Sequence, residues 1–215
     1  MRVFKVSYDA NKTAFPIETL SIKGNYSHFS ENNELENLIA DANNSFKLTD
    51  LMSYSYKTIE FFIISEKMKK IIESNYGSMK SFDLKFVLMK HKGKEYKYYL
   101  LNFHYDWSND IIYDKVKFML YNIIKEKIIL AFNVNSKEEF KYKRSKKSGL
   151  NKIVIEDSKL LLNSNKFTKN NLFRFEIYRH HFFISEKLKE KFEQEKVTGI
   201  FINKKSVNFE YDTIS

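Results

Sequence analysis

The densest group of side chains that could do chemistry lies between residues 141 and 147. Basic residues there surround one aromatic residue, and the candidate partner-binding side chains are Tyr142, Lys143, Arg144, Lys146 and Lys147. Such a patch could contact phosphates while the tyrosine stacks on a base, or it could face an acidic protein surface. A run of charges is more commonly a solvated loop. The run is therefore a candidate binding surface, with an exposed loop as the alternative.

Trp107 is the only tryptophan in the chain and the second candidate for partner binding. It follows a predicted strand and is flanked by Asp106, Ser108, Asn109 and Asp110. An exposed tryptophan is a good interface anchor, because it buries much apolar area in a partner. The alternative is a corner residue of the core.

Other side chains that resemble catalytic or metal-binding groups have simpler explanations. His180 and His181 are adjacent, so on a strand they would point to opposite faces and could not bind one metal ion. Ser65 and Ser185 lie outside any G-x-S-x-G turn and fit helix N-caps, while Gly199 fits the end of a turn. The chain has no cysteine, which excludes disulfides, thiolate metal sites and a cysteine nucleophile. We expect no enzyme activity, cofactor or metal; an enzyme with an unrecognised site is a minor alternative.

The elements that would position these residues alternate between strands and short helices. Strands are expected over residues 2–8, 58–64, 83–90, 96–105, 152–156, 172–184 and 200–203, and helices over 33–42 and after each of Ser65 and Ser185. Residues 91–94 should form a hairpin turn. Residues 110–134 fit helix and strand equally well, 140–152 are expected to be a loop or hairpin tip, and 207–215 an edge strand or a frayed end.

Two segments of the chain are similar to each other. Residues 61–69 (FFIISEKMK) match residues 182–189 (FFISEKLK) when the Ser-Glu-Lys triplets are aligned. Each copy predicts a strand, a serine cap and a short helix. The match indicates either an internal duplication of a strand–helix–strand unit or convergence on favourable capping residues.

Composition and charge limit the class of protein. The chain has 215 residues, 43% of them hydrophobic, with five glycines, one proline and a net charge of +10. We predict one α+β domain spanning 1–215, with possible halves 1–110 and 111–215, built from a mostly antiparallel or mixed sheet and a few short amphipathic helices. No stretch approaches the roughly 18 apolar residues that cross a bilayer. We therefore expect a cytoplasmic protein that does not bind membranes.

The C-terminal segment resembles a known family. Its elements are Asn171-Leu172-Phe173-Arg174-Phe175, then Phe183-Ile184-Ser185-Glu186-Lys187-Leu188-Lys189, then Val197-Thr198-Gly199-Ile200-Phe201. This order resembles the closing signature of the immunity-protein-eleven family of bacterial polymorphic toxin systems. Tyr98-Tyr99-Leu100-Leu101-Asn102 resembles a second family strand, so the resemblance covers residues 61–203.

The resemblance implies a cytoplasmic antidote that binds a toxin encoded beside it and blocks that toxin by protein–protein contact. It implies no catalytic residue, cofactor or metal, and a cognate toxin domain as the partner. The net charge of +10 suggests the alternative, a basic accessory protein that binds nucleic acid. Arginine is the usual reader of phosphates and bases, and here it is far rarer than lysine, which makes nucleic acid the less favoured partner.

Overall fold

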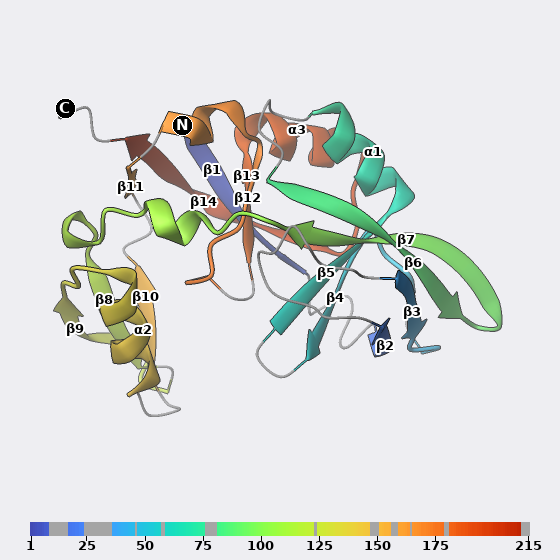
Figure 1. The fold of residues 1–215 in the computed structure, drawn as a ribbon, viewed down its shortest axis with the longest axis horizontal. Helices are drawn as coiled ribbons and strands as arrows, with labels where there is room; N and C mark the ends of the chain where they lie inside the picture. The colour runs from blue at the N-terminus through green and yellow to red at the C-terminus, as the bar shows by residue number, and fades with distance from the viewer. Residues whose placement is uncertain are drawn as a thin grey trace.

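The computed structural model describes residues 1–8, 17–23, 36–45, 47–56, 59–75, 81–122, 124–146, 151–155, 159–163, 165–178 and 181–211. Its strands form three sheets, and short helices lie against them (Figure 1). The fold is α+β with mixed sheets, which confirms the predicted class. Pro16, Gly77, Lys147, His180 and the C-terminal residues 212–215 lie outside the described residues.

The largest sheet has six strands in the order β2-β3-β6-β7-β5-β4. Their bounds are β2 Ile17–Lys23, β3 Glu36–Ala42, β4 Leu51–Tyr56, β5 Ile59–Ser65, β6 Phe82–His91 and β7 Lys94–Phe103. Helix α1, Glu66–Ser74, connects β5 to β6. All neighbours are antiparallel except β3 and β6, which are parallel.

The second sheet has five strands in the order β11-β14-β1-β13-β12. Their bounds are β1 Arg2–Tyr8, β11 Lys159–Leu162, β12 Leu172–Phe173, β13 Phe182–Ser185 and β14 Ile200–Tyr211. Helix α3, Glu186–Gln194, connects β13 to β14. Because β1 pairs with β13 and β14, the first strand of the chain belongs to the sheet of its C-terminal half.

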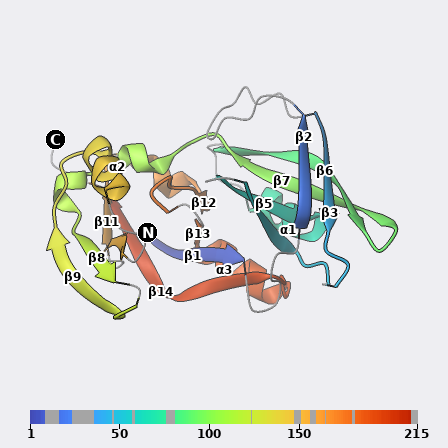
Figure 2. The same cartoon turned by 90° about the horizontal axis from the view of Figure 1, so that it is seen from below.

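The third sheet is small and lies at the end of the molecule far from the six-stranded sheet (Figure 2). Its order is β10-β8-β9, with β8 Phe118–Asn122, β9 Lys127–Phe132 and β10 Asn151–Ile155. Helix α2, Lys137–Ser145, packs beside it (Figure 1). Two short 3-10 turns, η1 Trp107–Asp110 and η2 Tyr113–Lys115, connect β7 to this sheet, and a third, η3 Asn165–Lys169, precedes β12.

Four of our predicted elements were wrong. Residues 207–211, expected as an edge strand or a frayed end, belong to β14, which lies between β11 and β1. Residues 36–42 form strand β3, because Leu38, Ala40 and Ala42 are buried at alternate positions and β3 pairs with β6. The single strand predicted over 172–184 is two strands, since the chain leaves the sheet after Phe173 and buried Arg174 lies over the ring of Phe62, 4.7 Å from its centre. The predicted loop at 140–152 starts inside helix α2 and ends in the first two residues of β10.

The six- and five-stranded sheets share a topology. In each, a short strand (β4 or β12) precedes a strand (β5 or β13) that ends in a serine cap and leads into a helix. In each, the strand after the helix (β6 or β14) has a parallel neighbour (β3 or β11) on one side and an antiparallel one (β7 or β1) on the other. The N-terminal strand β1 thus takes the place that β7 has in the first unit. A duplication stays a prediction; the structure shows the similarity of arrangement.

Corresponding side chains also make corresponding contacts. Ser65 and Ser185 each accept a hydrogen bond at 3.2 Å from the backbone nitrogen three residues later. The hydroxyl of Ser65 donates to Asp50 at 2.6 Å, and that of Ser185 donates to Asn171 at 2.7 Å. Both serines therefore cap a helix and attach its start to the preceding strand.

The two helices lie side by side over a shared core (Figure 1). This core contains Met68 and Ile72 from α1, Leu188 and Phe192 from α3, and aromatic residues of both sheets such as Phe62. The amphipathic spacing of these residues explains why short helices form here, since burial of one face stabilises them more than helix propensity does. The two units therefore depend on each other for burial.

Replacing Ser185 with alanine should lower the free energy of unfolding by roughly 1–2 kcal/mol, because the helix loses its cap and Asn171 loses a hydrogen bond. Urea denaturation of the variant measures this loss. Binding to any partner should not change, because Ser185 is buried. A loss of binding at unchanged stability would contradict the structural role.

Candidate partner-binding surface

Helix α2 carries most of the basic run and has a clear inner face. Ser136 is its N-cap and accepts a hydrogen bond from the backbone nitrogen of Glu139 at 3.1 Å. Phe140 is buried and lies 5.1 Å from Phe118 of β8, centre to centre. Glu138, Lys141, Tyr142 and Ser145 are exposed, so α2 displays charged and polar groups on its outer side.

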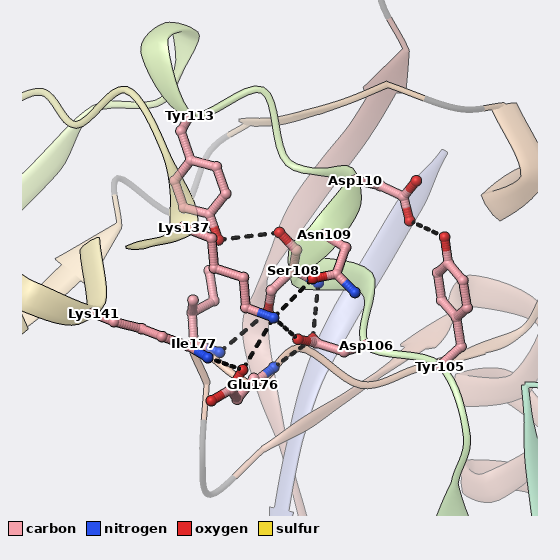
Figure 3. Close-up of polar contacts among 10 residues, drawn as sticks. All are labelled: Tyr105, Asp106, Ser108, Asn109, Asp110, Tyr113, Lys137, Lys141, Glu176 and Ile177. Atoms are coloured by element: carbon pink, nitrogen blue, oxygen red, sulfur yellow. Dashed lines mark hydrogen bonds and ion pairs between the residues drawn. The ribbon is translucent and has the colours of Figure 1, made fainter. Parts of the chain in front are cut away.

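A polar cluster holds the start of α2 (Figure 3). The ammonium group of Lys137 lies 2.5 Å from Asp106 and 3.0 Å from Glu176, and it also donates to the side chain of Asn109 at 2.8 Å. Asp106 accepts further hydrogen bonds from the backbone nitrogens of Ser108 at 2.9 Å and Glu176 at 2.8 Å. The cluster thus connects α2, the turn η1 and the segment after β12.

The electrostatics of this cluster favour its charged form. Partial burial opposes the charge on Lys137, but the hydrogen bonds and negative charges of Asp106 and Glu176 outweigh it and raise the pKa of the lysine. Burial likewise opposes the charge on Glu176, yet Lys141 and Lys137 lower the pKa of this carboxyl group. The lysines of α2 and the two carboxylates thus stabilise each other's charged forms. Their ion pairs hold α2 against η1 and the segment after β12.

Acid should weaken this attachment. Because the pKa of Glu176 lies below its ordinary value of 4.5 in the folded protein, its contribution to stability is complete above that pH. The contribution is lost as the pH falls below 4.5 through the lowered pKa. Measured between pH 6 and pH 3, the fall in unfolding free energy should be smaller for Glu176→Gln than for the unmodified protein. An identical fall in both would contradict this role of Glu176.

A pocket of about 380 Å³ opens beside the cluster. Charges of both signs line it: Lys141 lies 2.9 Å from Glu176, and a guanidinium nitrogen of Arg144 donates to the carbonyl of Ile177 at 3.4 Å. The lining is completed by Phe140 and Ser145.

The predicted binding residues of α2 divide into two groups. Lys143 and Arg144 turn toward the protein: Lys143 pairs with Glu139 at 2.8 Å and donates to the carbonyl of Asn133 at 3.0 Å. Tyr142 and Lys146 point outward, with Tyr142 63% exposed and the lysine 5.5 Å from the centre of its ring. The outward pair, Tyr142 and Lys146, is the accessible part of the predicted surface.

Trp107 is a core residue and not the exposed anchor that we considered. Its side chain is fully buried, between Tyr105 at 4.9 Å and Phe173 at 5.4 Å, centre to centre. The turn η1, capped by Asp106, directs the indole inward. A partner cannot reach it in this structure.

Sequence reasoning missed an apolar surface on the β8–β9 hairpin. Ile128, Ile129 and Leu130 of β9 are 52%, 50% and 55% exposed, and Ile124 in the turn is exposed as well. A continuous apolar run is typical of a buried strand, so the sequence alone could not place it outside. We use the name hairpin–helix surface for these four residues of the hairpin and for Tyr142, the exposed aromatic residue of α2.

The chain matches no protein-family model and no curated protein. Among the described residues, no helix has the length and hydrophobicity needed to span a membrane. Across the same ranges, no group of three or more histidine, aspartate or glutamate side chains is placed to hold a metal ion.

Proposed function

We propose that this protein is an immunity protein that binds a cognate bacterial toxin in the cytoplasm and neutralises it by covering its working surface. The observation that carries the proposal is the hairpin–helix surface. Large apolar side chains exposed next to each other on a folded domain mark sites of protein–protein contact. The sequence resemblance of residues 61–203 to an immunity family supports the same function.

The hairpin–helix surface has the composition of an interface. It offers isoleucine and leucine side chains and the ring of Tyr142 for burial, and the exposed lysines Lys125 and Lys127 adjoin the apolar residues along the chain. Apolar centres supply most of the binding energy, while surrounding charges speed association and select the partner. The ion pairs of Lys137 hold α2 in place before binding. Less conformational entropy is then lost when a partner contacts this helix.

Nucleic acid is a less suitable partner for this surface. Two of the basic residues of α2, Lys143 and Arg144, make contacts within the protein. Binding to phosphates would weaken steeply as salt rises, whereas burial of isoleucine and leucine side chains would not. Retention of binding in high salt therefore distinguishes the two partners.

Coexpression tests the proposed function. A toxin domain encoded next to this gene should stop growth of a bacterial host when produced alone, and growth should be restored when this protein is produced with it. The matched control is the same protein with Asp substituted at Ile128 and Leu130, which should protect poorly although it folds. Continued toxicity in the presence of the unmodified, soluble protein would contradict the proposal.

A further inference from the structure

Strand β9 is an open edge. Its residues pair with β8 on one side, from Phe118 with Phe132 to Asn122 with Lys127. On the other side no strand of the described residues pairs with it. The backbone N–H and C=O groups along that side can therefore accept another strand, which natural sheets normally prevent with charges or a covering element.

Both faces of β9 are exposed as well as its edge. The pairing with β8 shifts register at Ile129 and is regular beyond it, where Leu130 and Ala131 pair with Leu120 and Met119. Successive side chains of a strand point to opposite faces, yet both Leu130 and Ala131 are exposed. By contrast, β6 alternates between buried and exposed residues toward its end, as expected for a strand that covers a core. The apolar side chains of β9 thus do not serve the core of this protein, and an added strand with residues on both faces would bury them.

Lysines outnumber acids at both ends of β9. At the turn, Lys125 and Lys127 are exposed and flank a single acid, Glu126. At the other end, Lys115, Lys117 and Asp114 line a pocket with Phe132. The ammonium of Lys143, which pairs with Glu139, lies 5.2 Å from the centre of that ring. The sequence between these ends, from Ile128 to Ala131, carries no charge.

This distribution disfavours a second copy of the chain as the added strand. Two antiparallel copies of β9 would bring the basic turn of one next to the basic far end of the other. Like charges placed opposite each other across a sheet are destabilising. A strand with an apolar centre and acidic ends would instead match both the hydrophobicity and the charge.

We propose that β9 binds an extended segment of a partner protein, apolar at its centre and acidic at its ends, as an added strand of the three-stranded sheet. The inference rests on the proposed function in taking that partner to be the toxin. Backbone hydrogen bonds would provide affinity in this mode, and the side chains on the two faces would provide specificity. Lysines at the ends of β9 would select the acidic segment.

The first test uses a defined probe and needs no toxin. The probe is a short synthetic peptide in which valine and threonine alternate between aspartate-rich ends, and its control has lysine-rich ends. The full-length protein should bind the acidic peptide more tightly than the lysine-rich one by at least tenfold at low salt. If the two peptides bound with equal affinity, or if neither bound tightly, the proposal that β9 selects an acidic extended segment would be overturned.

Amide hydrogen exchange locates the contact. Binding of an added strand should slow exchange at alternate residues of β9, because only every second backbone N–H faces the open edge. Protection confined to α2 or to the six-stranded sheet would overturn the inference even if binding is tight. A dimer of the free protein, held through β9, would overturn it too, since the edge would then belong to a second copy.

Substitutions separate this inference from the proposed function. Leu130→Asp should weaken toxin binding at least about tenfold, whereas Phe86→Asp, at a residue of β6 that is 50% exposed, should leave it unchanged. Both variants should fold, as their circular dichroism would show. Toxin binding unaffected by Leu130→Asp would overturn the strand inference and keep the proposed function. Tight peptide binding without any toxin binding would overturn the proposed function and keep the strand inference.

Discussion

Replacing Asp106 with alanine should lower the free energy of unfolding by about 3 kcal/mol, since it removes one partner of a buried ion pair and leaves buried donors without this acceptor. Asp106 is buried and accepts hydrogen bonds from Lys137 and from the backbone nitrogens of Ser108 and Glu176. Without the carboxylate, three donors lose their acceptor at once. Urea denaturation, followed by circular dichroism, measures the change.

Two further variants divide this effect into its parts. Asp106→Asn keeps an oxygen for the backbone donors but loses the charge opposite Lys137, so its loss of stability should be intermediate. Asp114→Ala removes an exposed acid of η2 and should change stability by no more than about 0.5 kcal/mol. If Asp106→Ala were as stable as Asp114→Ala, the cluster would not be what holds α2 in place.

Gly199→Ala should destabilise the protein by about 3 kcal/mol, through two separate causes. The backbone φ of Gly199 is +73°, a conformation that costs an L-residue energy. In addition, a β-carbon at this position would overlap the carbonyl oxygen of Leu51 and the side chain of Thr49. These segments are joined there, because the backbone nitrogen of Leu51 donates to the carbonyl of Thr198 at 3.1 Å.

Gly93 provides the matched control for this substitution. Its φ is +71°, almost the same as that of Gly199, but a β-carbon there meets no atom within 4 Å. Gly93→Ala should therefore cost only the backbone term, about 1 kcal/mol. The difference between the two variants in thermal or urea unfolding measures the close approach of the two units. Equal losses would show that the units have room to move apart.

Local signals in the sequence predicted local structure well. The turn signal at Lys92 and Gly93, between two alternating segments, predicts the hairpin that β6 and β7 form. Both residues of this turn have positive φ. Ser65 and Ser185 were identified as caps because a capping hydrogen bond spans only three residues. Ser136 and Glu139 have capping-box spacing, which is a local signal for the start of α2. The dense charges that follow favour a loop in the sequence, and this signal is overridden by burial of Phe140.

Nonlocal pairing decided the elements that the sequence did not reveal. The leucine and isoleucine spacing in β3 fits a helix, and only pairing with β6 makes it a strand. The place of β1 beside β13 and β14 joins the first residues of the chain to the last sheet, with the amino group of Met1 2.7 Å from the carbonyl of Phe209. Such pairings have no signature within a short window of sequence.

The candidate site was predicted only in part for the same reason. The basic run at 141–147 was found by composition, but which of its residues face outward depends on how Phe140 and Lys137 are held. Trp107 lies in polar sequence surroundings and is nevertheless buried. The apolar residues of β9 look like core residues in sequence, and their exposure follows from the position of β9 at the edge of a small sheet.

The central claim is that this protein binds a toxin through the hairpin–helix surface. Isothermal titration of the purified protein with the toxin domain encoded beside it tests this most directly, in both low and high salt. We predict a one-to-one complex whose affinity is largely retained as salt rises and is lost when Ile128 and Leu130 are both replaced with aspartate. Absence of heat and of any complex with a folded, active toxin domain would contradict the account.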